Sequence, residues 1–300
     1  MLDIELFGME LKNPLMLASG ILGVSGVSLK RVALSGGAGA IVTKSIGMTP
    51  REGHRNPTFV ELDNGYLSAI GLANPGYIEF EEEIDVAKAG NVPIIASVYG
   101  FSFREYVEVA RVMGGYGVDA IELNLSYPNV GKAGAFYGYS EELAHEVVEE
   151  VKKEVNLPVI AKLTAGAGDI VAIAKACEDA GADGITAIGS LRAMKIDIET
   201  GRPVLGNKMG GLSGSCLKPI AVRCVYEISR EVSIPVIGCG GITTGEDAIE
   251  YFMAGANAVQ IGTGILSRGI TIFKKVSLEI KEYMKENGYS GIDEIIGLAL

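Results

Sequence analysis

The chain has 300 residues, of which 48% are hydrophobic, so it can bury a sizeable core, and intrinsic disorder and miniature scaffolds are excluded. Its 26 basic and 37 acidic residues give a net charge of −11, which argues against nucleic acid or an anionic membrane as the main partner. Glycine is the unusual component, because 41 residues are roughly twice the usual share and predict many tight turns.

The amino terminus and the cysteines bear on whether the protein is secreted, spans a membrane or binds a metal. Acidic residues occupy the stretch MLDIELFGMELKNP, where a signal peptide carries basic ones, and no apolar run reaches the roughly 18 residues of a membrane span. We therefore expect a cytoplasmic protein with a small-molecule substrate and with neither a nucleic-acid nor a membrane partner. The cysteines at 177, 216, 224 and 239 form no C-x-x-C motif, so no metal site is expected.

Short apolar runs alternate with amphipathic stretches along the whole chain. The alternating pattern of Asp3–Phe7 and Met9–Lys12, divided by Gly8, predicts a short β-hairpin. The apolar runs that follow are typical of strands buried on both faces of a parallel sheet: Leu15–Ser19, Ala40–Lys44, Pro93–Val98, Ala120–Asn124, Pro158–Leu163, Gly184–Ile188, Ile234–Gly238 and Ala258–Gly262. Helical patterns lie between and after them, near residues 28–36, 77–89, 102–115, 140–154, 168–180, 217–231, 244–253 and 269–286.

Eight strands, each followed by a helix, predict a TIM (β/α)8 barrel, and the lack of a linker-like segment predicts a single domain over residues 1–300. The hairpin is then expected to cap the bottom of the barrel. An open dinucleotide-binding sheet is the alternative, but it needs G-x-G-x-x-G after the first strand, where Ala18–Gly23 reads ASGILG. The longest non-helical insertion, roughly residues 47–75, follows the second strand, and at the carboxyl face of a barrel such an insertion usually covers a ligand.

Two of the eight strand ends carry a lysine, and in such a barrel the strand ends hold the functional groups. Lys44 ends the second strand and Lys162 lies at the end of the fifth. A buried ammonium group must meet an anion, an oxygen-rich ligand or an acidic partner, and no other strand ends in an acid. The lysines therefore indicate a ligand in the mouth of the barrel.

Three glycine clusters lie next to the last two strands, at Gly210–Gly214, Gly238–Gly241 and Gly262–Gly264. Glycine lets backbone N–H groups approach a phosphate, and the loops after strands 7 and 8 form the recurrent phosphate site of this fold. A phosphate on this side and two lysines across the mouth suit a phosphorylated ring cofactor such as FMN, because a lysine stabilises the reduced anionic flavin.

The sequence resembles the class 1 dihydroorotate dehydrogenases, in particular the catalytic (FMN) subunits of the type that pairs with an NAD-linked iron–sulfur partner. The resemblance covers essentially the whole chain. It is carried by these stretches: NPLMLASG at 13–20, TPREG at 49–53, IGLANPG at 70–76, IDIETGRPVL at 196–205, GGLSG at 210–214 and IGCGGI at 237–242.

This resemblance implies an FMN-dependent oxidoreductase that acts on a CH–CH bond and oxidises dihydroorotate to orotate in pyrimidine biosynthesis. The positions implied for FMN are Ser19, Lys44, Ser45, Ser97, Asn124, Lys162, Ile188, Gly214, Gly240, Gly241, Gly262 and Thr263. The positions implied for the substrate are Lys44, Ser68, Gly71, Leu72, Asn124, Asn129, Gly189 and Ser190, with Lys44 facing the substrate carboxylate.

Three positions depart from the family pattern on the substrate side. Tyr127, in the stretch NLSYPN, replaces the cysteine that serves the family as general base, and Ser68 and Gly189 replace asparagines. We expect Tyr127 and Lys44 to be the catalytic residues. A free phenol, with a pKa of about 10, is less ionised at neutral pH than a thiol of about 8.5. Either Lys44 lowers the tyrosine's pKa, or the tyrosine acts as an acid.

These departures leave three hypotheses open. The leading one is dihydroorotate oxidation, the second is a paralogous FMN enzyme for another unsaturated ring or enoyl compound, and the third is a non-catalytic flavin-binding barrel. The family also implies a homodimer. Since the chain has neither an NAD fingerprint nor a cysteine cluster, electron transfer to NAD would need a second subunit with FAD and an iron–sulfur centre, as in a heterotetramer.

Overall fold

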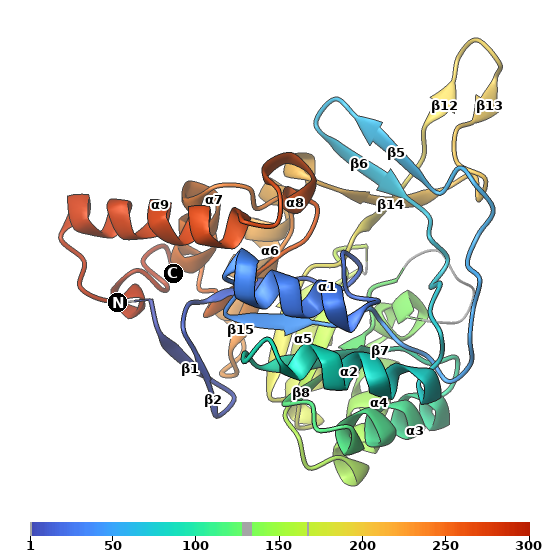
Figure 1. Cartoon of the computed structure of the whole chain (residues 1–300), viewed down its shortest axis with the longest axis horizontal. Coiled ribbons are helices and arrows are strands. Elements are labelled where there is room, and N and C mark those ends of the chain that lie inside the picture. Colours follow the sequence, from blue (N-terminus) through green and yellow to red (C-terminus); the bar gives the residue numbers. More distant parts are fainter. Residues whose placement is uncertain (1, 128–133, 167) are drawn as a thin grey trace.

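Eight parallel strands close into a barrel in the computed structural model, which describes residues 2–127, 134–166 and 168–300 (Figure 1). Around the barrel the strands follow chain order, and β16 pairs back to β3. Their bounds are β3 Leu15–Leu17, β4 Ala40–Val42, β7 Ile94–Val98, β8 Ala120–Asn124, β9 Val159–Leu163, β10 Gly184–Ala187, β15 Val236–Cys239 and β16 Ala258–Ile261. Each of the eight strands predicted for the barrel is a barrel strand, so the TIM-barrel prediction is confirmed.

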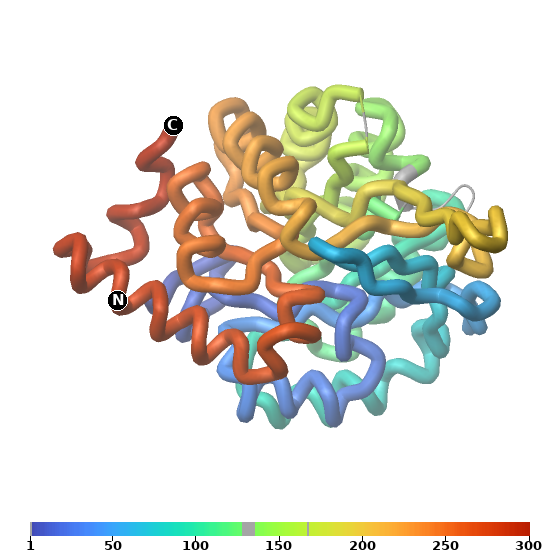
Figure 2. Tube along the Cα trace, turned by 90° about the horizontal axis from the view of Figure 1, so that it is seen from above, coloured from blue at the N-terminus to red at the C-terminus, as the bar shows by residue number. Residues whose placement is uncertain are grey.

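Helices surround this barrel, as the view from above shows (Figure 2). Their bounds are α1 Gly26–Arg31, α2 Glu81–Lys88, α3 Phe103–Gly115, α4 Glu141–Glu154, α5 Ile170–Asp179, α6 Lys218–Ser229, α7 Gly245–Met253, α8 Gly264–Arg268 and α9 Ile272–Asn287. Short 3-10 or π turns are η1 Val32–Gly36, η2 Ile78–Phe80, η3 Gly134–Tyr139, η4 Ser215–Leu217 and η5 Ile292–Glu294. Ser102, Ser140 and Thr244 start α3, α4 and α7 by accepting a hydrogen bond from an N–H three residues on. The one-turn helix α8 was not predicted.

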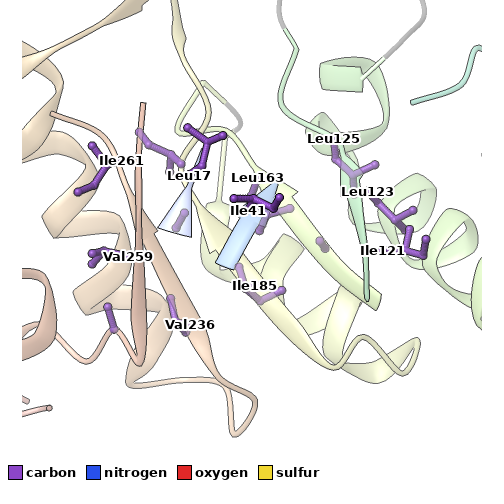
Figure 3. Close-up of a cluster of buried hydrophobic side chains, with 14 of the residues drawn as sticks. Leu17, Ile41, Ile121, Leu123, Leu125, Leu163, Ile185, Val236, Val259 and Ile261 are labelled. Carbon is purple, nitrogen blue, oxygen red and sulfur yellow. The ribbon is translucent and has the colours of Figure 1, made fainter. Parts of the chain in front are cut away.

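The barrel strands are apolar on both faces at their amino ends and become polar inside the barrel toward their carboxyl ends. Outward-facing residues such as Leu17, Ile121 and Leu163 pack with the helices in one buried cluster (Figure 3). Inward-facing residues such as Ala120 and Ile160 fill the lower interior. Because side chains alternate between faces, the residues two positions further on, including Glu122 and Lys162, point into the upper interior.

The amino-terminal hairpin closes the lower end of the barrel, as predicted. Strands β1 Ile4–Leu6 and β2 Met9–Leu11 pair antiparallel. Their apolar side chains Leu6, Met9 and Leu11 join the lower interior cluster with Met16 of β3. The hairpin therefore replaces water at the end of the barrel that carries no predicted functional residue.

Two insertions, one after β4 and one after β10, combine into a sheet above the mouth of the barrel (Figure 1). Its strands are β5 Phe59–Leu62, β6 Gly65–Ser68, β11 Leu191–Ala193 and β14 Gly210–Ser213, and the pair β12 Ile196–Asp197 and β13 Arg202–Pro203 extends from it. The insertion expected over residues 47–75 is therefore present, but it holds a hairpin, and its partner after β10 was not predicted. Among the described residues, no helix has the length and apolar character needed to cross a membrane.

Candidate active site at the carboxyl end of the barrel

A pocket opens at the carboxyl ends of the barrel strands, beneath the inserted sheet. Its atom-free space is about 1070 Å³, counting the part open to solvent. The pocket is lined by these residues of the predicted site: Ser19, Lys44, Ser45, Ser68, Leu72, Asn124, Tyr127, Lys162, Ile188, Gly189, Ser190, Gly214, Gly240, Gly241, Gly262 and Thr263. One pocket thus brings together the positions expected for cofactor and for substrate.

Two predicted site residues that the structure describes, Ser97 and Gly71, do not line this pocket. Ser97 is fully buried behind the wall, where its Oγ lies 2.9 Å from Ser45 Oγ. Gly71 contributes its backbone, because its N–H donates to the hydroxyl oxygen of Tyr127 at 2.8 Å. Asn129 lies outside the described residues.

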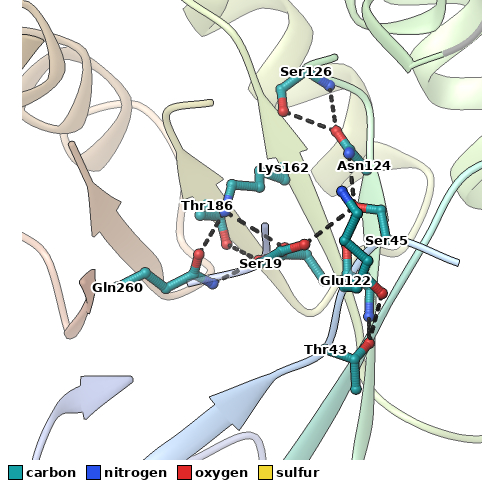
Figure 4. Close-up of polar contacts among 11 residues, drawn as sticks. Ser19, Thr43, Ser45, Glu122, Asn124, Ser126, Lys162, Thr186 and Gln260 are labelled. Atoms are coloured by element: carbon teal, nitrogen blue, oxygen red, sulfur yellow. Dashed lines mark hydrogen bonds and ion pairs between the residues drawn. The ribbon is translucent and has the colours of Figure 1, made fainter. Parts of the chain in front are cut away.

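A chain of hydroxyl and amide groups runs along one wall of the pocket (Figure 4). Ser45 Oγ lies 3.1 Å from Ser19 Oγ and accepts a hydrogen bond of 2.9 Å from Asn124 Nδ2. Asn124 Oδ1 accepts hydrogen bonds from Ser126 N at 3.1 Å and Ser126 Oγ at 2.9 Å. The amide orientation is therefore fixed, and Asn124 keeps one N–H to offer to a ligand.

Lys162 lines the pocket and contacts a group of buried polar side chains (Figure 4). Its Nζ donates to Gln260 Oε1 at 2.5 Å and lies 3.6 Å from Glu122 Oε1. Glu122 is fully buried, and its Oε2 accepts from Gln260 Nε2 at 2.6 Å and from Thr186 Oγ1 at 3.1 Å. Lys162 therefore has an acidic partner, one of the alternatives left open for a buried lysine, and this acid lies two residues before the end of β8 rather than at a strand end.

Lys44 differs from Lys162 in having no acidic partner among the described residues. Its side chain is only 7% exposed, and burial lowers the pKa of its ammonium group from 10.5 to about 8. A lysine in this state gains most from an anion that enters the pocket, because the anion supplies the missing opposite charge. The structure thus supports the view that Lys44 faces an anionic ligand.

The glycine loops on the opposite side of the pocket approach one another closely. A Cβ on Gly241 would lie 2.8 Å from Gly214 O, and both glycines have positive φ, +68° and +97°. Within the described part of the chain, the N–H groups of Gly240, Gly241 and Thr263 donate to no backbone or side-chain acceptor. Unused N–H groups at one end of a pocket suit a phosphate.

Gly189 faces Ser126 at the mouth of the barrel. A Cβ on Gly189 would lie 2.3 Å from Ser126 Oγ and 2.4 Å from Ser126 Cβ, so this position has no room for a side chain while Ser126 keeps its place. Ser126 in turn is held by Asn124. Sequence reasoning missed Ser126 as a pocket residue, although it follows the selected Asn124 by two positions.

Comparisons with known proteins agree with the geometry. A family model described as dihydroorotate dehydrogenase matches residues 1–284. A Methanocaldococcus jannaschii protein named dihydroorotate dehydrogenase B (NAD(+)), catalytic subunit, is 50% identical over 303 residues, covering 100% of this chain and 98% of the relative. Proteins of the same name from Methanosarcina acetivorans and Pyrococcus abyssi are each 48% identical, covering 98% and 100% of this chain and 95% and 99% of the relatives, respectively.

Proposed function

This chain belongs to the dihydroorotate dehydrogenase family, and we infer that it oxidises dihydroorotate to orotate in pyrimidine biosynthesis. The observation that carries the inference is identity of about one half over the full length of relatives named for this activity. The pocket adds independent support, since it holds two buried lysines and a glycine cradle in one place. The alternative of another ring or enoyl substrate, raised by Tyr127, Ser68 and Gly189, is not favoured by these relatives.

We propose that the pocket holds a flavin, and specifically FMN. Gly214, Gly240, Gly241 and Thr263 would hold the phosphate, because their loops pack tightly and three of them present unused N–H groups. Lys162 would face the ring, because only one of its three N–H donors is used by a hydrogen bond to the described residues. When bound, the flavin supplies the acceptor for the hydride that leaves C6 of dihydroorotate.

Tyr127 is proposed to handle the proton that leaves C5 of dihydroorotate. It lines the pocket, and its hydroxyl oxygen accepts the N–H of Gly71 at 2.8 Å. A donor on this oxygen stabilises a phenolate more than a phenol, and so it favours the form that accepts a proton. The loss of one proton and one hydride from the substrate leaves the C5–C6 double bond of orotate.

Lys44 is proposed to hold the substrate carboxylate. It lines the same pocket as Tyr127 and has no acidic partner in the described part of the chain. Because a lysine is a point charge that orients a ligand poorly, the remaining N–H of Asn124 is proposed to fix the ring. Ser68, Leu72 and Ser190 line the pocket as further candidates for substrate contacts.

The proposed activity is tested by anaerobic mixing of the purified, flavin-loaded chain with dihydroorotate. Loss of the oxidised flavin absorption, together with stoichiometric orotate, is the expected result. Persistence of the oxidised spectrum with dihydroorotate, while dithionite still reduces the flavin, would exclude this substrate. Release of the cofactor by heat and its mass then decide between FMN and FAD.

A partner subunit is also proposed, because the relatives are named as catalytic subunits of an NAD(+) enzyme. We propose a homodimer of this chain that joins an FAD and iron–sulfur subunit in a heterotetramer. Co-purification of such a subunit, with NAD reduction only in the complex, is expected. Full activity of the isolated chain with fumarate as electron acceptor would contradict the need for it.

A further inference from the structure

A fully buried carboxylate, that of Glu122, lies beneath the pocket without lining it. Glu122 belongs to β8, two residues before Asn124, and Asn124 is level with Lys162 in the register of β8 and β9. The side chain of Glu122 therefore points into the barrel one layer below Lys162. Among the described residues, Glu122 Oε1 has no hydrogen-bond partner and forms an ion pair with Lys162 Nζ at 3.6 Å.

Gln260 of β16 connects this acid to the lysine. Its Nε2 donates to Glu122 Oε2 at 2.6 Å, and its Oε1 accepts from Lys162 Nζ at 2.5 Å. The amide therefore has its donor on the acid and its acceptor on the ammonium group, which is the orientation that a charged pair requires (Figure 4). Thr186 of β10 adds a hydrogen bond of 3.1 Å to the same carboxylate oxygen.

The charge of Lys162 depends on this arrangement. Burial by itself lowers the pKa of Lys162, but the neighbouring acidic groups of Cys239 and Glu122 outweigh burial, and the pKa is raised. Burial raises the pKa of Cys239 itself, which leaves the thiol neutral at physiological pH. Glu122 is therefore the acidic group that the geometry places beside the lysine, with its Oε1 at 3.6 Å from Lys162 Nζ. Lys44, which lacks such a partner, has a lowered pKa in the same pocket.

We propose that Glu122 is the positioning residue for Lys162. Directly and through Gln260, it holds the ammonium group charged and fixed from below, so that the two N–H donors left over remain available to the pocket. This inference rests on the proposed function in one respect: the ligand that would accept hydrogen bonds from these two N–H donors is taken to be a flavin. The pairing itself is a property of the chain alone, so it is testable without the cofactor.

The experiment compares the titration of individual lysines in the flavin-free full chain, labelled with ¹³C at lysine Cε. Signals are assigned by loss in Lys162→Met and Lys44→Met. In the wild type, Lys162 is expected to stay protonated up to at least about pH 10. In Glu122→Gln, its titration midpoint is expected to fall by at least about one pH unit, a tenfold loss of proton affinity. Lys44 serves as the internal control, with an unchanged midpoint of about 8.

A charge swap separates positioning from a merely structural role. In the double variant Glu122→Gln with Gln260→Glu, the acid moves to the residue that already bonds Lys162. The midpoint of Lys162 should return toward the wild-type value. An unchanged midpoint in Glu122→Gln would overturn the proposal, and so would a lowered midpoint in the swap. If Glu122→Gln does not fold, the swap alone decides by the same criterion.

The flavin-loaded forms provide a second measurement that does not depend on dihydroorotate. The reduction potential of the bound flavin, followed against pH, should show an additional break in Glu122→Gln where Lys162 loses its proton. The wild type and the swap should show no such break below about pH 10. Failure of the chain to bind any flavin would count against the proposed function, while the lysine titration would still decide the role of Glu122.

Discussion

The hydroxyl oxygen of Tyr127 accepts a hydrogen bond of 2.8 Å from the backbone N–H of Gly71, which joins the loop after β8 to the insertion after β4. Gly71 has a positive φ of +80°, and a Cβ on it would lie 2.6 Å from the backbone nitrogen of His54. Glycine is therefore required where the backbone donates to the tyrosine. Tyr127, which is proposed to handle the substrate proton, thus has a specific anchor, which a reactive residue needs in order to hold its place.

Tyr127→Phe tests the proton-transfer role. The variant keeps the ring and removes the oxygen, so flavin reduction by dihydroorotate should slow by roughly 10²- to 10⁴-fold, the usual contribution of a positioned acid or base. Stopped-flow absorbance of the flavin-loaded chain measures this rate. Flavin content should stay at the wild-type level.

Tyr99→Phe is the matched control for that variant. The Tyr99 hydroxyl is buried, accepts from Asn74 Nδ2 at 2.9 Å and does not line the pocket. Its loss is expected to lower stability by about 1 kcal/mol, the usual value of a hydrogen bond, with the reduction rate preserved. Equal slowing in both variants would show that the Tyr127 oxygen has no special part in the chemistry.

Orotate binding should depend on pH through Lys44. In the free protein burial lowers the pKa of Lys44 to about 8. The carboxylate of bound orotate would raise this pKa again, so binding above about pH 8 takes up a proton. The Kd for orotate should therefore be constant below about pH 8 and rise by up to tenfold per pH unit above it. Calorimetry in buffers of different ionisation enthalpy measures the proton uptake, and Lys44→Met should show weak, pH-independent binding.

Stability of the ligand-free chain provides a second test of Lys44. The folded state holds the Lys44 proton less tightly than the unfolded state, so stability rises as the pH increases from about 8 to 10.5, and the full penalty is present below that window. At neutral pH, Lys44→Met is expected to increase the free energy of unfolding by about 3 kcal/mol. Urea unfolding of both proteins measures this difference. A lower free energy of unfolding in Lys44→Met would contradict the view that burial of the charged lysine costs stability.

Much of this fold and part of the site were predictable because their signals are local. Each barrel strand is an apolar run of its own, and a lysine in such a run, as at Lys44 and Lys162, is visible without any knowledge of its neighbours. Glu122 has a local signal too, since it stands in the apolar strand Ala120–Asn124. A search of every inward-facing position, rather than of strand ends alone, would have found it.

The inserted sheet and the pairings across the barrel were not predictable in this way. Strands β6 and β14 pair through residues such as Leu67 and Leu212, far apart in the sequence, and both strands are short and begin with glycine. Likewise, the 3.6 Å approach of Lys162 to Glu122 depends on the register of β8 and β9, which no single segment encodes. Which strand pairs with which distant strand does not change the pattern of apolar and polar residues within either strand, so the pairing is not visible in the sequence of one segment.

Gly189→Ala should disturb the site through Ser126. The added Cβ would meet both side-chain atoms of Ser126 at under 2.5 Å, and overpacking of this kind costs about 1 to 3 kcal/mol. Adding Ser126→Gly removes both clashing atoms, so the double variant should be less destabilised than the sum of the single variants. A double-mutant cycle by urea unfolding measures this coupling. Additive effects would show that the two residues do not constrain one another.

Asp247 should make the side of the pocket that is proposed to hold a phosphate sensitive to acid. Its carboxylate accepts from Lys218 Nζ at 2.8 Å and from Thr243 N at 2.8 Å, which ties the start of α6 to the loop after β15. Burial raises the pKa of Asp247, but these hydrogen bonds outweigh burial and lower it to about 2. The stabilisation by the charged carboxylate is therefore fully present at pH values above 3.8, the ordinary pKa of aspartate, and is lost as the pH falls through about 2. Urea midpoints of the wild type should exceed those of Asp247→Asn at neutral pH and converge with them in that window, whereas a gap that persists at lower pH would assign the effect to shape rather than charge.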